Sequence, residues 1–181
     1  MPACAGMTKL ICPRSLLTAL LLAFLPVAFP ARADAPARVV AVHDGDTVTV
    51  LSNQRPLRIR LTDIDAPELG QPFGKRSKTA LADLCFGRAA ALEIRGRDRY
   101  GRTLARLSCD GVDANAEQVR RGYAWVFTRY AQANSPLYAL QLDAQAAGRG
   151  LWTDRAPTAP WEWRRRRRTA ARSVRLSDSS R

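Results

Sequence analysis

The residues of this chain that are best suited to chemistry lie in three short clusters. They are Asp44-Gly45-Asp46-Thr47, the run Arg60-Leu61-Thr62-Asp63-Ile64-Asp65-Ala66-Pro67-Glu68, and Asp98-Arg99-Tyr100-Gly101-Arg102. The carboxylates supply oxygen ligands of the kind that a hard divalent cation prefers. The arginines supply guanidinium groups, which can hold a phosphate through two parallel hydrogen bonds. This combination indicates a site that cleaves phosphodiesters.

Other kinds of site are limited by the residue types that are available. His43 is the only histidine, so a zinc site with several histidines is excluded and a Ser-His-Asp enzyme would have to use this residue. We interpret His43 as an ordinary polar residue at a strand end. Asp44-Gly45-Asp46 alone is typical of a tight turn. Together with the carboxylate of Asp65 on a second loop, however, it can bind a cation.

The segments between the clusters predict an α+β domain that is mainly β. Alternating or β-branched residues predict strands at 38–42, 47–50, 57–61, 89–95 and 103–108, with a hairpin turn at 52–54. Apolar residues at helical spacing predict helices at about 73–86, from Asp113 to Gly122, and from Ser135 to Gly148. Five strands and three helices fit a small barrel with flanking helices.

The N-terminal residues predict export. Basic residues precede an apolar stretch that ends at Phe29, and Ala31-Arg32-Ala33 follows it, which is typical of a signal peptide over 1–33 that is cleaved after Ala33. The stretch is shorter than the ~20 apolar residues of a membrane span, and a retained anchor is the alternative. We therefore expect a periplasmic or secreted protein without a stable membrane anchor.

The remaining chain divides into a domain at 34–152, an extended Pro- and Trp-containing segment at 153–163, and a disordered Arg-rich tail at 164–181. The whole chain has a formal net charge of +13, and the tail contains eight arginines and one aspartate. The basic character is thus mainly a property of the tail. The alternative to a solvated tail is one that binds nucleic acid or the anionic cell envelope.

Two cysteines, Cys85 and Cys109, lie outside the predicted signal peptide. In an oxidising compartment an even number of cysteines favours a disulfide. Two separate buried thiols are the alternative.

The three clusters, as D-G-D-T, R-L-x-x-I-D-x-P-E and D-R-Y-G-R in this order, resemble the thermonuclease family. Its members are secreted, calcium-dependent nucleases of the staphylococcal nuclease type. The resemblance covers about Ala37 to Trp152. It implies a five-stranded OB-fold barrel with three flanking helices, and a monomeric hydrolase that cleaves phosphodiester bonds of DNA, RNA or both.

The resemblance also implies a metal site and a proton acceptor. Asp46 and Asp65 match the carboxylates that bind Ca²⁺, and the backbone carbonyl of Ala66 matches a third ligand. Glu68 matches the carboxylate that activates the attacking water. Calcium bound in this way would orient the phosphate and neutralise part of its charge.

Phosphate and nucleotide contacts follow from the same resemblance. Arg60 and Arg102 match the arginines that hold the scissile phosphate. Tyr100 and Tyr130 match tyrosines of the nucleotide pocket, and we assign Arg99 to substrate binding with them.

Several features depart from the staphylococcal pattern, among them the Cys85–Cys109 pair, which the staphylococcal enzyme lacks. The loop 69–72 is shorter, Thr128 stands where one pocket tyrosine is expected, and Asp63 adds a carboxylate beside the site. The main alternative function is a non-catalytic OB-fold module that binds single-stranded nucleic acid. Such a module needs aromatic platforms and a basic groove. Carboxylates would repel the polyanion unless a metal intervened, which favours the enzyme.

Overall fold

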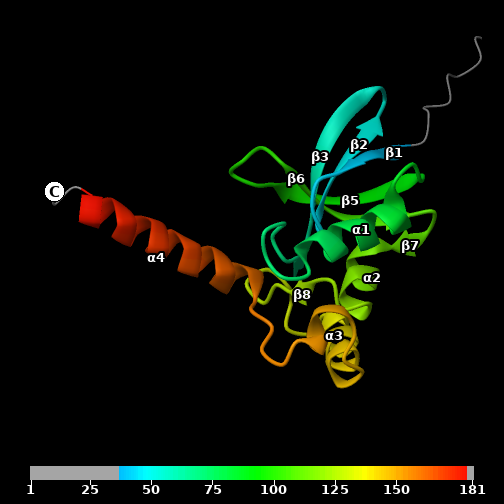
Figure 1. Cartoon of the computed structure of the whole chain (residues 1–181). Helices are drawn as coiled ribbons and strands as arrows, with labels where there is room; N and C mark the ends of the chain where they lie inside the picture. The colour runs from blue at the N-terminus through cyan, green and yellow to red at the C-terminus, as the bar shows by residue number, and fades with distance from the viewer. Residues whose placement is uncertain (1–36, 179–181) are drawn as a thin grey trace, which may run out of the picture. The chain divides into compact units, whose positions relative to one another are not determined.

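The computed structural model describes residues 37–178, so the predicted signal peptide lies outside the described residues. The main sheet contains β1 (Arg38–Val42), β2 (Thr47–Ser52), β3 (Arg55–Leu61), β5 (Ala90–Arg97), β6 (Thr103–Cys109) and β7 (Val112–Asp113). A second, two-stranded sheet pairs β4 (Ile64–Asp65) with β8 (Trp125–Val126). The helices are α1 (Gly74–Cys85), α2 (Ala114–Arg120), α3 (Leu137–Ala146), the 3-10 helix η1 (Gly150–Thr153) and α4 (Pro160–Asp178) (Figure 1).

The main sheet has the strand order β1-β2-β3-β6-β5, and β7 pairs with β6. β3 and β6 are parallel, whereas the other neighbours are antiparallel. The two ends of the sheet meet in an isolated bridge between Arg38 and Ala89 rather than in a continuous ladder. The described residues therefore form a mixed, mainly β fold that is consistent with an OB-like architecture, but the closed barrel that we expected is not seen in them.

The register between β2 and β3 brings the first two clusters together. Asn53 and Gln54 have positive φ angles of 49° and 60°, as a tight two-residue hairpin turn requires. The hairpin places Thr47 opposite Arg60. Asp46, which precedes β2, thus lies beside the end of β3 that carries Arg60.

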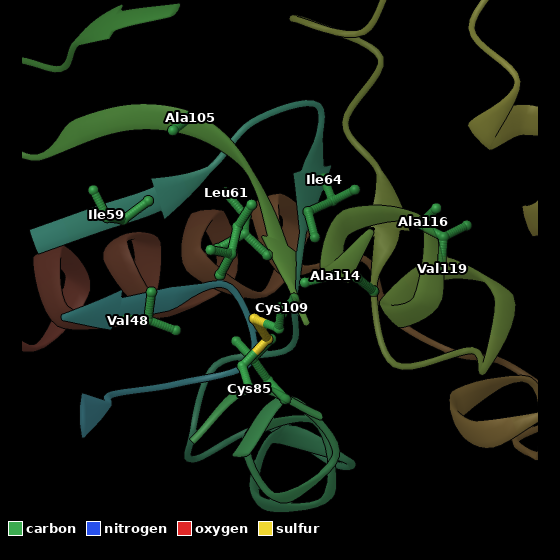
Figure 2. Close-up of a cluster of buried hydrophobic side chains, with 14 of the residues drawn as sticks. Val48, Ile59, Leu61, Ile64, Cys85, Ala105, Cys109, Ala114, Ala116 and Val119 are labelled. Carbon is green, nitrogen blue, oxygen red and sulfur yellow. A yellow bond between two sulfur atoms is a disulfide. The ribbon is translucent and has the colours of Figure 1, made fainter. Parts of the chain in front are cut away.

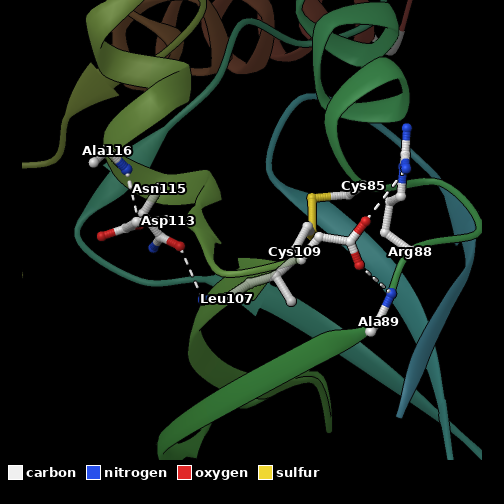
Figure 3. Close-up of a disulfide and its surroundings, with 9 residues drawn as sticks. Cys85, Arg88, Ala89, Leu107, Cys109, Asp113, Asn115 and Ala116 are labelled. Carbon is white, nitrogen blue, oxygen red and sulfur yellow. Dashed lines mark hydrogen bonds and ion pairs between the residues drawn. A yellow bond between two sulfur atoms is a disulfide. The ribbon is translucent and has the colours of Figure 1, made fainter. Parts of the chain in front are cut away.

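The core is formed by buried residues of the sheet and of the helices α1 and α2 (Figure 2). Within it Cys85 and Cys109 form a disulfide, with Cα atoms 5.2 Å apart, that links the end of α1 to the end of β6 (Figure 3). Both cysteines are almost fully buried. The structure thus contains one disulfide and not the two separate thiols of the alternative.

The C-terminal residues differ most from the sequence prediction. We expected an extended segment at 153–163 and a disordered tail at 164–181, but α4 covers Pro160–Asp178. Pro160 stands at the first helical position, where its fixed φ suits a helix. Arginine, the commonest of the following residues, has high helix propensity. The prediction was wrong for 160–178 because it gave more weight to repulsion between like charges than to this propensity.

No helix among residues 37–178 is both long enough and apolar enough to span a bilayer.

Candidate active site

The three clusters line one cavity of about 1070 Å³. All the residues that the sequence assigned to metal, catalysis or substrate line this cavity: Asp46, Arg60, Asp65, Ala66, Glu68, Arg99, Tyr100, Arg102 and Tyr130. The structure therefore brings together segments that lie far apart in the sequence.

Asp46 is held by hydrogen bonds on both carboxylate oxygens. Its Oδ2 accepts from the backbone N–H of Ala66 at 2.6 Å, and its Oδ1 accepts from the hydroxyl of Thr47 at 3.1 Å. The N–H of Asp46 donates to Oδ1 of Asp44 at 3.0 Å, which fixes the turn. Asp46 is only 5% exposed, so the position of its carboxylate is set by the fold.

The turn that carries Asp46 packs so closely against its neighbours that position 45 requires a glycine. A Cβ atom at Gly45 would lie 1.8 Å from Oγ of Ser77 in α1 and 2.7 Å from Cβ of Ala66. The buried side chain of Gln118 in α2 donates to the carbonyl of Gly45 at 2.7 Å and to that of Ser77 at 3.1 Å. The sequence indicated that this glycine forms a turn, whereas the structure shows that it lets the turn approach α1.

We expect Gly45→Ala to lower the free energy of unfolding by about 1–3 kcal/mol, the usual range for overpacking, and to reduce activity by displacing Asp46. Thermal unfolding and a cleavage assay measure the two effects. The matched control is Gly70→Ala, because a Cβ at Gly70 meets nothing within 4 Å. Equal unfolding temperatures for the two variants would contradict the close-packing role of Gly45.

Arg60 links the two acidic loops. Its Nη2 lies 2.9 Å from Oδ1 of Asp65 and 3.1 Å from Oδ2 of Asp46. Its Nη1 donates to the backbone carbonyls of Leu61 at 2.6 Å and Ile64 at 2.9 Å. Arg60 therefore holds both carboxylates and the β3–β4 connection in this structure, in addition to the phosphate role implied by the sequence.

The electrostatics of Asp46 favour a bound cation. The pKa of Asp46 is raised to about 7, chiefly by burial and also by the charges of Asp44 and Asp65, while the charge of Arg60 acts in the opposite direction. A buried carboxylate with a raised pKa at neutral pH gains from a nearby positive charge.

The donor set also fits a hard cation. Asp46, Asp65 and the backbone carbonyl of Ala66 offer only oxygen ligands, which suit Ca²⁺. Among residues 37–178 no group of three His, Cys, Asp or Glu side chains is arranged to hold a metal. A cation bound by the two carboxylates would therefore also need the backbone carbonyl and water.

Arg164 from α4 reaches the same carboxylates. Its Nη2 donates to Oδ2 of Asp65 at 2.6 Å, and its Nη1 donates to Oε1 of Glu68 at 2.7 Å and to Oδ1 of Asp65 at 3.2 Å. Burial alone would lower the pKa of Arg164, but these hydrogen bonds and charges raise it above its ordinary value. Sequence reasoning missed this residue because it assigned Arg164 to a disordered tail.

Arg102 is oriented by Asp98. Its Nε lies 2.7 Å from Oδ2 of Asp98, while Oδ1 of Asp98 accepts from the backbone N–H groups of Tyr100 and Arg102. Burial would raise the pKa of Asp98, but the hydrogen bonds and the charge of Arg102 hold it below its usual range. Asp98 thus stays ionised, and within the described residues no hydrogen bond engages the Nη atoms of Arg102.

The predicted nucleotide contacts lie at the exposed rim of the cavity. Tyr100 is 68% exposed and Tyr130 is 65% exposed, so both rings are accessible to bases. Arg99 donates from Nη2 to the hydroxyl of Tyr100 at 2.7 Å. Tyr130 packs edge to face against Phe127, with ring centroids 5.0 Å apart.

Four further residues near the site have defined places. Arg95 and Arg97 also line the cavity. Asp63 has a φ of 63°, and its carbonyl accepts from the N–H of Phe127 at 2.8 Å, so it serves the connection between β3 and β4. His43 is hydrogen-bonded to the hydroxyl of Thr49 at 2.8 Å and is the ordinary polar residue that we expected.

Comparison with known proteins assigns the chain to a family. The family model described as "Staphylococcal nuclease homologue" matches residues 58–154. The chain belongs to the staphylococcal nuclease family. A protein from Haemophilus influenzae named "Uncharacterized endonuclease" is 42% identical over 152 residues, which cover 83% of this chain and 84% of that protein. A Shigella flexneri protein named "Micrococcal nuclease" is 40% identical over 156 residues, which cover 81% of this chain and 90% of that protein.

The resemblance seen in the sequence is thereby confirmed. The part that matches the staphylococcal nuclease model contains Arg60, Asp65, Glu68 and Arg102. Asp46 precedes it and Arg164 follows it, and both reach the site through the contacts described above.

Proposed function

We propose that this chain is an exported, calcium-dependent nuclease that hydrolyses phosphodiester bonds of DNA, RNA or both. The observation that carries the proposal is the convergence of Asp46, Asp65 and Glu68 with two arginines, Arg60 and Arg102, on one cavity in a chain of the staphylococcal nuclease family. The chain is a hydrolase of phosphodiester bonds. Its dependence on calcium, its export and the roles of individual residues are parts of the proposal.

Asp46, Asp65 and the carbonyl of Ala66 would hold Ca²⁺, which when bound would neutralise charge on the phosphate. The Glu68 side chain is 43% exposed, so water can approach it, and its carboxylate can accept a proton from that water. Glu68 first has to be released by Arg164, which binds Oε1 in this structure.

Arg102 would stabilise the phosphate. Asp98 holds the Nε edge of its guanidinium, which leaves the Nη groups to donate to phosphate oxygens as negative charge develops. Arg60 would contribute in the same way while keeping Asp46 and Asp65 in place.

The test is to incubate the exported protein with single-stranded DNA and with RNA, in the presence of calcium or of a chelator. N-terminal sequencing of this protein should begin at Asp34 if the signal peptide is cleaved as proposed. We expect cleavage with calcium and none with chelator. Glu68→Gln is the matched variant, because it should lose cleavage and retain binding. Tight binding without cleavage in calcium would instead support the non-catalytic binding module.

A further inference from the structure

The first turn of α4 is fixed beside the active site. The ring of Trp161 stacks on Phe127, with centroids 5.4 Å apart and an interplanar angle of 11°, and lies 5.8 Å from the ring of Trp125 in β8. Just before the helix, the carbonyl of Thr158 accepts from Nε2 of Gln71 at 2.6 Å. Phe127 also lines the cavity. The helix therefore begins at a defined point next to the proposed catalytic groups.

One face of α4 is directed at the cavity. Arg164 and Arg168 both line it, together with Arg60 and Arg102. Residues four apart share a helix face and are separated by about 6 Å along the axis. Arg166, two positions from each, projects from another side of the helix and lies 4.0 Å from Glu162.

The present partners of Arg164 are needed elsewhere if the proposed function holds. Asp65 would be engaged by calcium and Glu68 by water, so the guanidinium of Arg164 would lose both carboxylates. It would nevertheless stay near the cavity, because the packing of Trp161 anchors the helix that carries it. A buried or partly buried cation without a partner is costly, and the anion that enters this cavity with the substrate is phosphate.

We propose that α4 is a nucleic-acid-binding arm, in which Arg164 and Arg168 bind phosphates of the strand that enters the active-site cavity. The inference deepens the proposed function and rests on it for the identity of the polyanion. The spacing of the two side chains is of the same order as that of successive phosphates in a strand. Their orientation toward a cavity favours a strand over a flat anionic membrane surface, which could reach only the outer side of the helix.

The decisive comparison is between Arg168→Gln and Arg166→Gln in the otherwise unchanged protein. Both remove one charge from the same helix, and both residues are exposed, but only Arg168 lines the cavity. Binding of a fluorescent single-stranded 12-nucleotide DNA is followed by anisotropy in chelator at several salt concentrations. We expect Arg168→Gln to weaken binding about 3- to 10-fold and to reduce the slope of log K against log salt by about 0.7, the value for one phosphate contact on a single strand.

Arg166→Gln should give a smaller loss and leave that slope close to the wild-type value. The same loss and slope for both variants would overturn the proposal, since only the overall charge would then matter. The proposal would also be overturned if Arg168→Gln weakened binding to anionic phosphatidylglycerol vesicles but left binding to DNA unchanged. Because no cleavage is needed, the result is independent of whether the chain is a calcium-dependent nuclease.

Arg164→Gln provides a second variant, measured in calcium in a Glu68→Gln background so that the DNA stays intact. We expect weaker DNA binding than in the background protein, because one phosphate contact is lost. Unchanged or tighter binding would mean that Arg164 only covers the carboxylates, and this would contradict the role of α4 as an arm. Circular dichroism and thermal unfolding confirm that each variant is folded.

Discussion

We expect replacement of Arg102 by glutamine to lower kcat about 10²- to 10³-fold, which is the usual effect of removing one preorganised donor to a developing negative charge. The substitution leaves Asp98 able to accept from the backbone N–H groups of Tyr100 and Arg102, so the turn should persist. Arg102→Lys should not restore the rate, because an ammonium group cannot bind Asp98 and a phosphate with the same planar fork. Initial rates on single-stranded DNA in calcium measure the effect.

The matched control is Arg58→Gln, which makes the same change in charge on the exposed side of β3 outside the cavity. It should keep kcat close to the wild-type value. Asp98→Asn should give an intermediate loss of rate, because it weakens only the orientation of Arg102. A normal kcat for Arg102→Gln would remove Arg102 from the proposed mechanism.

The second large effect is the pH dependence of stability that Asp46 should cause when a chelator keeps the protein free of metal. Its pKa is raised from 3.8 to about 7, chiefly by burial, so between these values the folded state binds more protons than the unfolded state. The contribution of Asp46 to the free energy of unfolding should therefore be highest below about pH 4. This contribution should fall by a few kcal/mol as pH rises through about 7. Urea unfolding at a series of pH values in chelator measures this dependence.

Asp46→Asn should remove most of this pH dependence, because no proton is bound or released at that position. The variant should also bind calcium more weakly, since one carboxylate ligand is lost. In the wild-type protein, calcium affinity should fall as pH drops below about 7, because the cation and a proton compete for the same carboxylate. Calorimetry in buffers of different ionisation enthalpy detects the released proton. An unchanged pH dependence in Asp46→Asn would show that another group carries it.

The sequence predicted the local structure well where short-range physics dominates. A helix was predicted to start at Asp113, and this residue caps α2 by accepting from the N–H of Ala116 at 3.0 Å. The hairpin at Asn53 and Gln54 adopts the positive φ angles that a tight turn needs. The three clusters could be found in the sequence because their residue types are informative at short spacing.

Contacts between distant segments could not be predicted in the same way. Gln118 binds the turn at Gly45 across 73 positions of sequence, and Arg164 binds Asp65 across 99. Neither a polar residue in a helix nor a run of arginines has a local feature that indicates which distant residue it will contact. The order of α4 also depends on tertiary contacts of Trp161, whereas like charges at Arg164 and Arg168 oppose a helix when it is considered alone.

The pairing of β4 with β8 has a consequence for the stage of folding at which the site becomes competent. Asp65 is opposite Trp125 in this pair, and the N–H of Val126 donates a hydrogen bond of 2.7 Å to Oε1 of Gln141 in α3. Asp65 therefore precedes in the chain both of the segments that fix its final geometry. β8 must pair with β4, and α3 must bind β8, before Asp65 reaches this geometry, so the site becomes competent late in folding, after these two segments have joined the domain.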